Sequence, residues 1–406
     1  MFNQKCRLSK EKLKKIMSFG KMPIANNFLQ KNDFSKNEFL YDMEVYFSEK
    51  LSLFQLGNHP PITKMFNKNY AFISSTSKFM DQHFKETKNW IIKEKYLDLR
   101  KKNKVIEIGC NDGIFLKNFL SNDKFDVFGF EPSDNVAKIA RNRGIKIYNK
   151  FFNFKNVNQH LNSVKNTDLI YAANAFCHIP NLIDIIKGID LCLKENGYLI
   201  FEDPYLGSML EKVSYDQIYD EHIFIFSILS VEKIFNLFNF TLVDAIPLET
   251  HGGSMRYVVK KQFKAKQSSR LVKLKEKELK NNLDDFSTYK RFKNNCELSK
   301  KRFRNNLLKI KNKKQKIFGY GATSKSTTIL NYCEIGKDII DYIVDTSPTK
   351  IWKYSPGMHI PILPYEIFKN NFPDVYVLFA WNHAKEIKNK EKLFSKKGKW
   401  ITHLKN

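Results

Sequence analysis

The chain has 406 residues, of which 42% are hydrophobic and 14% aromatic, and its formal net charge is +27. This apolar content is enough for two or three packed domains and excludes a disordered chain. No apolar run reaches the roughly 18 residues of a membrane span, and the first residues lack the apolar segment of a secretory signal. We therefore expect a cytoplasmic protein without a membrane partner.

The positive charge comes mainly from lysine, which supplies 60 of the 69 basic residues. A nucleic-acid partner is one interpretation of such a charge. Proteins that read nucleic acid favour arginine, however, so we expect no nucleic acid but a solvated lysine surface that attracts a phosphorylated small substrate. The six cysteines are scattered without a C-x-x-C pair. This spacing indicates buried free thiols and argues against a disulfide framework or a self-contained zinc site.

The first 80 or so residues show no clear helix or strand pattern. Beyond them, helices are predicted over 84–99, 114–120, 133–143 and 181–193, and strands over 104–108, 126–130, 145–148, 168–172 and 198–201. Residues 263–315 are charged and free of Gly and Pro, which predicts one or two long helices. A second pattern follows, with strands over 316–320, 339–344 and 375–380 and a helix over 325–332. Strands that alternate with helices predict an α/β chain with parallel sheets.

The strongest motif is the run VIEIGCNDGI over residues 105–114, which is followed 22 positions after Gly109 by Glu131. A strand that enters a glycine turn lets the backbone approach a ligand closely, and an acidic residue at the end of the next strand can accept both hydrogen bonds of a ribose diol. The spacing resembles motif I of class I S-adenosylmethionine-dependent methyltransferases. That resemblance implies a cofactor site made of Glu107, Gly109, Asn111, Asp112, Gly113, Glu131 and Asn174.

A second group of polar residues follows predicted strands. His178 comes after the strand 168–172, and the run Tyr219-Asp-Glu221-His222 comes after the strand 198–201. A lone histidine in a polar loop is most often structural. Here several groups able to move protons gather near the carboxyl ends of strands, where open α/β sheets bind ligands. His251, which is followed by Gly252 and Gly253, is a further member of this group of polar residues.

The order of the motifs resembles the sugar C-methyltransferase family, which methylates a carbon of a nucleotide-linked keto-sugar. The marks are the segments at 23–29, 74–77, 107–113, 130–133, 219–222, 251–254, 319–326, 354–357 and 381–382. The resemblance spans nearly the whole chain. It implies a small N-terminal domain (1–80), a class I methyltransferase (Rossmann-like) central domain (81–262), and a helical linker with a second Rossmann-like domain (263–406). It also implies a keto-sugar C-3 methyltransferase-like activity in surface-polysaccharide synthesis; we expect a monomer.

The resemblance assigns roles to several residues. His222 would be the general base that removes the proton next to the sugar ketone. Tyr219 and Glu221 would orient that base or the substrate, and His178 would contact the sugar. Tyr70 is the candidate for a further sugar contact, although Phe72 occupies a place where tyrosine is also common. Histidine suits the role of base because its pKa lies near neutrality.

One feature departs from the family. Its members carry two C-x-x-C pairs in the N-terminal domain, whereas here Cys6 is followed by Ser9, and the second pair is replaced by Ser48 and Leu51. One thiolate with serine and leucine cannot form a tetrahedral zinc site. We therefore predict no structural zinc.

Three other interpretations stay open. The same base could deprotonate a sugar hydroxyl, which would make the protein an O-methyltransferase. A nucleic-acid methyltransferase is less favoured, because the prolines at 60–61 and 204 fit turns better than the motif of amino-methylating enzymes. The run Gly319 to Ser326 is close to a P-loop, but Ser324 replaces the glycine before the lysine, and it fits a dinucleotide-like turn better. The resemblance implies no redox cofactor there.

Overall fold

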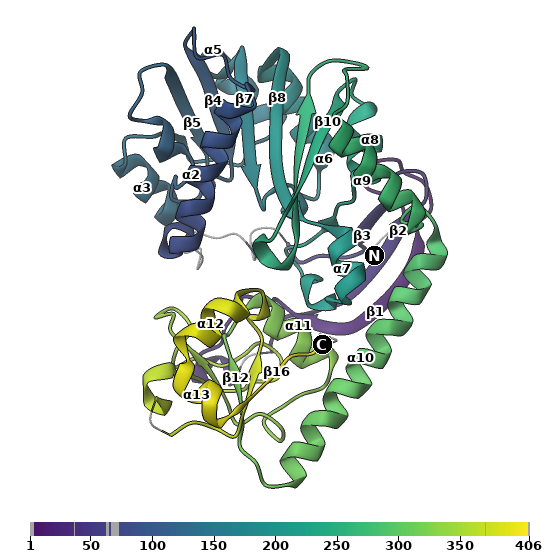
Figure 1. The fold of residues 1–406 in the computed structure, drawn as a ribbon, viewed down its shortest axis with the longest axis vertical. Coiled ribbons are helices and arrows are strands. Elements are labelled where there is room, and N and C mark those ends of the chain that lie inside the picture. Colours follow the sequence, from purple (N-terminus) through teal and green to yellow (C-terminus); the bar gives the residue numbers. More distant parts are fainter. Residues whose placement is uncertain (1–3, 36, 62–64, 66–72, 370, 405–406) are drawn as a thin grey trace.

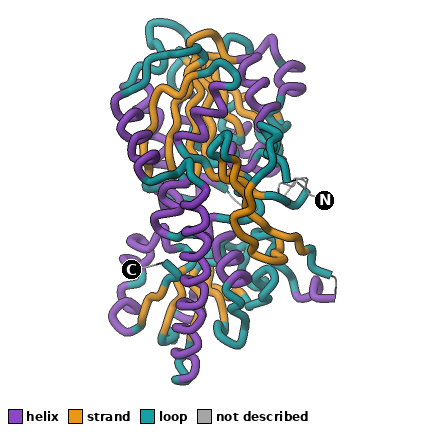
Figure 2. Tube along the Cα trace, turned by 90° about the vertical axis from the view of Figure 1, so that its right-hand side faces the viewer, coloured by secondary structure: helices purple, strands orange, loops and turns teal. Residues whose placement is uncertain are grey.

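The computed structural model describes residues 4–35, 37–61, 65, 73–369 and 371–404. A central α/β domain and a C-terminal α/β domain lie at opposite ends of the molecule, and the N-terminal strands lie between them (Figure 1). The long helix α10 (Phe286–Asn312) runs along one side from the first toward the second (Figures 1 and 2). Among the described residues no helix is long and apolar enough to cross a membrane.

The central domain is built on a seven-stranded sheet with the order β10-β11-β8-β7-β4-β5-β6. Its strands pair in parallel except at β11, which is antiparallel to both neighbours. The bounds are β4 Asn103–Ile108, β5 Phe125–Phe130, β6 Lys146–Tyr148, β7 Thr167–Ala173, β8 Leu193–Pro204, β10 Thr241–Leu248 and β11 Ser254–Lys260. The predicted Rossmann-like architecture and its five predicted strands are confirmed.

The helices of this domain are α2 Lys78–Lys93, α3 Asp134–Asn142, α4 Phe154–Gln159, α5 Leu161–Val164, α6 Leu182–Cys192, α7 Leu206–Lys212 and α8 Ile228–Asn236. Two predictions were wrong in extent. Helix α2 begins before residue 84, because Ser77 accepts a hydrogen bond from the Met80 N–H and caps it. The predicted helix 114–120 is only the 3₁₀ turn Leu116–Phe119, where Asn118 donates to the carbonyls of Ile114 and Phe115 and competes with α-helical bonding.

The N-terminal region is more regular than its sequence predicts. It forms an antiparallel sheet of β1 (Lys14–Pro23), β2 (Leu40–Ser48) and β3 (Leu53–Leu56), completed by β9 (Phe224–Ile225) from the central part of the chain. The pairing of β1 with β2 shifts register twice, between Lys15 and Met17 and between Ser18 and Gly20. These irregularities break the two-residue alternation that identifies a strand, which explains why the sequence pattern failed here.

A polar network occupies the N-terminal domain around positions to which the resemblance assigns metal ligands. The carboxylate oxygen Oε1 of Glu11 accepts hydrogen bonds from the Ser9 hydroxyl (3.3 Å), the Lys50 N–H (3.2 Å) and the buried Ser48 hydroxyl. Leu51 is buried in the apolar core together with Cys6. These residues offer one thiol and no second soft ligand, so they do not fit a tetrahedral zinc.

The C-terminal domain has a five-stranded parallel sheet with the order β14-β13-β12-β15-β16. Its strands are β12 Ile317–Tyr320, β13 Tyr342–Asp345, β14 Ile362–Pro364, β15 Val375–Leu378 and β16 Lys399–Ile401. Its helices are α11 Ser324–Tyr332, α12 Ala384–Lys390 and α13 Lys392–Lys397. The long helical stretch predicted between the sheets is present as α9 (Ser269–Lys280) and α10.

Candidate active site

The loop after β4 has the backbone conformation of a ligand-binding turn. Gly109 and Gly113 have φ of +67° and +77°, which strains any residue with a Cβ. A Cβ on Gly113 would lie 2.3 Å from Ile145 Cδ1 and 3.1 Å from Ala140 Cβ, so the loop packs closely on α3 and on the residue before β6. The Gly109 N–H donates to the Phe130 carbonyl at 2.9 Å, which fixes the turn beside the end of β5. Asn111 also has a positive φ of 50°.

Three buried carboxyl groups surround this turn: Glu107, Asp112 and Glu131. Glu131 accepts hydrogen bonds from the N–H groups of Asn111 (2.9 Å) and Ser133 (2.8 Å). Burial raises the pKa of Glu131, and burial together with the charges of Asp112 and Glu131 raises the pKa of Glu107 well above its usual value. Glu107 Oε2 and Asp112 Oδ1 have no hydrogen-bond partner among the described residues.

This arrangement suits a cationic nucleoside. Buried acids with unused oxygens favour a ligand that brings positive charge and N–H or O–H donors. S-Adenosylmethionine carries a sulfonium, an ammonium and a ribose diol, so the residues present fit this cofactor. The Ser74 N–H donates to Asn111 Oδ1 at 3.1 Å and the Ser75 N–H to Asp112 Oδ2 at 3.3 Å. The serine motif that precedes α2 therefore holds the outer side of the turn.

Asn174 and His251 lie together at the carboxyl end of β7. Asn174 follows the strand with a positive φ of 50°, and its Nδ2 lies 3.1 Å from His251 Nε2. Burial, followed by the charge of Lys325, lowers the pKa of His251 to about 3, so its ring is neutral at pH 7. A Cβ on Gly109 would lie 3.4 Å from Ala175 Cβ, which places this strand end against the glycine turn.

His222 is buried with both ring nitrogens hydrogen-bonded. Nδ1 lies 2.6 Å from the Gln217 carbonyl oxygen, and Nε2 lies 2.8 Å from the Tyr219 hydroxyl. A carbonyl can only accept, so this network assigns the ring proton to Nδ1 and leaves the Nε2 lone pair to accept from Tyr219. Burial and, after it, the neighbouring His178 lower the pKa of His222 well below its usual value. The neutral ring thus presents a proton acceptor at Nε2.

His178 stacks on His222 with ring centroids 5.4 Å apart. Burial lowers the pKa of His178 to about 4. The side-chain donor atoms of Cys177, His178 and His222 lie within 4.8 Å of one another, and two imidazoles with a thiol are a set that transition metals accept. A metal there would compete with the hydrogen bonds that His222 already makes, so this cluster is not assigned to a resident ion.

Glu221 and Asp220 tie this loop to the N-terminal domain. Asn26 Nδ2 donates to Glu221 Oε1 at 2.8 Å, and the Ala25 N–H donates to Asp220 Oδ1 at 2.8 Å. Burial, and then the charge of Asp220, raises the pKa of Glu221 well above its usual value, which favours the protonated carboxyl group. The Ser324 hydroxyl of the C-terminal domain donates to Asn26 Oδ1 at 2.9 Å. The three domains therefore meet next to His222.

The structure brings together His178, Tyr219, Glu221 and His222, and separately the seven residues of the proposed cofactor site. Tyr70 and Phe72 lie outside the described residues. Sequence reasoning missed the role of Gln217, whose carbonyl orients His222; its place inside the run 215–222 was the available signal. It also missed the two partners of Glu202, which accepts hydrogen bonds from His83 and Arg256 at 2.6 and 2.7 Å; we call this arrangement the Glu202 clamp. These two partners come from α2 and β11, far apart in the chain.

The glycine turn after β12 in the C-terminal domain is hydrogen-bonded to side chains of the same domain. Asp345 accepts hydrogen bonds from the N–H groups of Ala322 and Ser347, each at 2.7 Å. The Lys350 ammonium donates to the Ala322 carbonyl at 2.7 Å. Thr323 and Ser326 form a reciprocal cap on α11. The backbone groups that would cradle a phosphate in a P-loop are thus partly engaged within the domain.

Three family models match the chain in succession. A zinc binding domain matches residues 6–66, a methyltransferase domain residues 83–245, and a C-methyltransferase C-terminal domain residues 249–404. The C-methyltransferase NovU of Streptomyces niveus is 27% identical over 94% of this chain and 90% of its own length. The first model matches residues that do not fit the metal, because Ser9, Ser48 and Leu51 stand where the resemblance places three of the four zinc ligands.

Solved structures of methyltransferases cover less than half of the chain. Magnesium protoporphyrin IX methyltransferase from Synechocystis PCC 6803, with bound SAM, is 12% identical, with a TM-score of 0.34 over 45% of this chain and 79% of its own. An S-adenosylmethionine-dependent methyltransferase from Clostridium acetobutylicum is 15% identical, with a TM-score of 0.35 over 46% of this chain and 94% of its own.

The sheet order, the acidic glycine turn and the methyltransferase-domain match define a class I S-adenosylmethionine-dependent methyltransferase. Its cofactor is S-adenosylmethionine. Within this class, the three consecutive model matches and the relative NovU, which covers 94% of this chain, make the chain similar to C-methyltransferases.

Proposed function

We propose that the protein methylates a carbon next to the ketone of a nucleotide-linked sugar, with His222 as the general base. The observation that carries this proposal is the hydrogen-bonded state of His222, whose Nδ1 is tied to the Gln217 carbonyl while Nε2 faces the Tyr219 hydroxyl. A buried imidazole held in one tautomer, with its lone pair on a second proton-transfer group, is built to move a proton.

Methyl transfer to carbon requires a carbanion equivalent, and a proton beside a ketone leaves too slowly without help. His222 Nε2 takes this proton, directly after Tyr219 moves aside or through the Tyr219 hydroxyl. The electron pair of the broken C–H bond forms the enolate. The resulting imidazolium keeps its Nδ1–H bond to the Gln217 carbonyl. Burial makes a lone imidazolium costly, but the enolate forms beside it and supplies the opposite charge.

The enolate oxygen needs hydrogen-bond donors, and several lie near the base. Tyr219 and His178 can donate, and so can Glu221 in its protonated form, which burial favours because it raises the pKa of this group. A neutral carboxylic acid in an apolar site can stabilise an oxyanion without bringing a negative charge of its own. Asn26 Nδ2 donates to Glu221 Oε1 and holds this side chain in place.

The proposed cofactor residues are Glu107, Gly109, Asn111, Asp112, Gly113, Glu131 and Asn174. Glu131 would accept the ribose hydroxyls, and the glycine turn would admit the amino-acid portion of the ligand. S-Adenosylmethionine supplies an electrophilic methyl group when bound. The chain's own contribution is to hold the nucleophilic carbon in line with that group and to exclude water.

The nucleotide-sugar substrate is supported by the motif order and by the relative NovU, which is named a C-methyltransferase. The lysine-rich surface adds a field that attracts a diphosphate. The role in surface-polysaccharide synthesis, the monomeric state, the cytoplasmic location and the absence of nucleic acid remain predictions, as do the domain limits at residues 80 and 262.

The test is His222→Asn, because an asparagine Nδ2 can still donate to the Gln217 carbonyl but cannot act as a base. Nucleotide-linked 4-keto-sugars are first screened by thermal shift and by the mass gain of one methyl group. We expect turnover to fall roughly 10²- to 10⁴-fold while S-adenosylhomocysteine binds as before. His160→Asn, at the end of α4, is the matched control. Near-normal turnover in His222→Asn would remove this residue from the mechanism.

Solvent exchange separates carbon from oxygen as the methyl acceptor. In D₂O without methyl donor, the wild-type protein should exchange the proton at the sugar carbon, and His222→Asn should not. Methylation of a hydroxyl breaks no C–H bond, so a methylated product without carbon exchange would support the O-methyltransferase alternative.

A further inference from the structure

The loop that carries the proposed base is held from outside the central domain. Both oxygens of the buried Asp216 carboxylate bind side chains of the C-terminal domain: Trp381 Nε1–H donates to Oδ2 at 2.6 Å, and His403 Nε2 lies 2.9 Å from Oδ1. Asp216 and His403 are 0% and 1% exposed. Burial by itself raises the pKa of Asp216, but His403, Lys325 and Trp381 outweigh it, so the carboxylate stays ionised.

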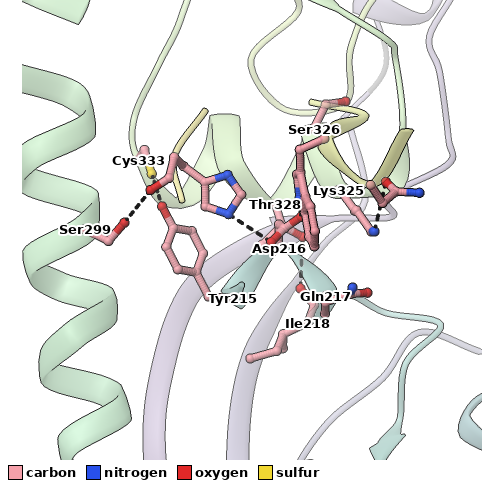
Figure 3. A network of polar contacts seen from close by, with 12 residues as sticks. Tyr215, Asp216, Gln217, Ile218, Ser299, Lys325, Ser326, Thr328 and Cys333 are labelled. Carbon is pink, nitrogen blue, oxygen red and sulfur yellow. Dashed lines mark hydrogen bonds and ion pairs between the residues drawn. The ribbon is translucent and has the colours of Figure 1, made fainter. Parts of the chain in front are cut away.

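The residues around Asp216 make further contacts in the same direction. The Tyr215 hydroxyl lies 3.2 Å from Cys333 Sγ, and the Thr328 hydroxyl donates to the Ile218 carbonyl at 2.9 Å. Figure 3 shows Tyr215 to Ile218 facing Lys325, Thr328 and Cys333, with Ser299 of α10 at the side. The segment 215–218 thus contacts the C-terminal domain at each of its ends.

Gln217 lies between this anchor and the base. Its carbonyl accepts the His222 Nδ1–H at 2.6 Å, and its side-chain Nε2 donates to the His251 carbonyl at 2.6 Å. The His251 carbonyl also accepts from Lys325 Nζ at 3.0 Å. The ring of Trp381 packs against Gly252, the residue after His251. A Cβ on Gly252 would lie 2.2 Å from that ring. A shift of Trp381 or Asp216 would therefore move the carbonyl that selects the His222 tautomer.

We propose that Asp216, held by His403 and Trp381, is a positioning residue that keeps the Gln217 carbonyl on His222 Nδ1. The C-terminal domain then sets the alignment of the base in addition to any contact with the substrate. This inference rests on the proposed role of His222 for its catalytic meaning, whereas the effect on the His222 ring can be measured without turnover.

Two substitutions test the anchor. Asp216→Asn has nearly the same shape, but it removes the negative charge and leaves one acceptor oxygen where Trp381 and His403 now bind two. His403→Phe removes the N–H donor and keeps an aromatic ring. His403→Gln places an N–H at a similar reach and serves as the conservative rescue. Glu391→Gln is the matched control. Glu391 is a buried carboxylate of the C-terminal domain, like Asp216 in its burial, but it binds Tyr320 and Tyr365 and not the loop that carries His222.

The first readout is the ¹⁵N spectrum of the full-length protein labelled at histidine, with the His222 signals identified by their loss in His222→Asn. We expect wild type, His403→Gln and Glu391→Gln to show a single Nδ1–H tautomer. Asp216→Asn and His403→Phe should show averaged tautomers. The second readout is kinetic: kcat should fall about 10- to 100-fold in these two variants, with KM changed less than twofold.

The outcomes separate the two proposals. A folded Asp216→Asn protein that keeps the wild-type His222 tautomer would overturn the positioning role. Loss of the tautomer with unchanged kcat would support the anchor and overturn the assignment of His222 as the base. If Asp216→Asn does not fold, His403→Phe against His403→Gln decides the same question, since both keep the Asp216 carboxylate.

Discussion

The glutamate network of the N-terminal domain leads to a prediction about metal and stability. Glu11 Oε1 accepts hydrogen bonds from two hydroxyls and one backbone N–H, and the Ser48 hydroxyl in turn accepts from the Leu51 N–H at 3.2 Å. The resemblance places cysteine ligands of a zinc at the positions of Ser9, Ser48 and Leu51. Here the Glu11 carboxylate accepts hydrogen bonds from Ser9, Ser48 and Lys50 and thereby joins the segments around residues 9 and 48–50. We therefore expect Glu11 to carry the stabilising role of the metal.

The magnitude follows from the contacts. Glu11→Ala removes three hydrogen bonds to a charged group and leaves the Ser48 hydroxyl, which is 0% exposed, without its acceptor. An unsatisfied buried group costs about 1–3 kcal/mol, and each lost bond about 1 kcal/mol when water can replace part of it. With the Ser48 hydroxyl left unsatisfied and the bonds from Ser9 and Lys50 also lost, we expect a loss of about 3–5 kcal/mol in the free energy of unfolding. Glu11→Gln keeps an acceptor oxygen and should lose about half as much.

The assay is urea unfolding followed by fluorescence and circular dichroism, with and without a chelator, together with elemental analysis of the purified protein. The control is Glu49→Ala, which removes an ion pair with Lys14 between half-exposed side chains and should change stability by less than about 1 kcal/mol. The chelator should have no effect. One tightly bound zinc per chain, or a Glu11→Ala protein as stable as Glu49→Ala, would refute the reasoning.

Two further predictions concern buried acids of the central domain. Burial raises the pKa of the Asp203 carboxyl group to about 8. Its ionisation therefore costs the folded wild-type protein stability as the pH rises from about 4 to about 8, and Asp203→Asn has no such group to ionise. The stability of Asp203→Asn relative to wild type should thus increase by up to about 1.4 kcal/mol per pH unit between pH 5 and 8, measured by urea unfolding, and parallel curves would contradict the buried ionisation. Glu131→Gln should weaken S-adenosylhomocysteine binding about 10- to 100-fold in calorimetry, because a carboxylate accepts both hydroxyls of a ribose better than an amide does; the exposed Glu195→Gln is the control, and equal affinities would place the ribose elsewhere.

Local patterns in the sequence were sufficient to predict most strands and helices of the two α/β domains. Strand 167–173 is buried on both faces, so its residues 169–173 appear as a continuous apolar run that predicts a strand. The acidic glycine turn is also a local feature, since its strand, its glycines and Glu131 follow one another in the chain. The segment 219–222 could be singled out because its proton-transfer groups are adjacent.

Tertiary structure alone decided how these groups work. The irregular register of β1 with β2 hid the N-terminal sheet, and the Glu202 clamp joins α2 to β11. Asp216 binds Trp381 and His403, which lie 165 and 187 positions away. Contacts over such separations leave no periodic signal, because each partner alone is an ordinary polar or aromatic residue. The tautomer of His222 likewise depends on where packing places one backbone carbonyl, and no side-chain pattern encodes that position.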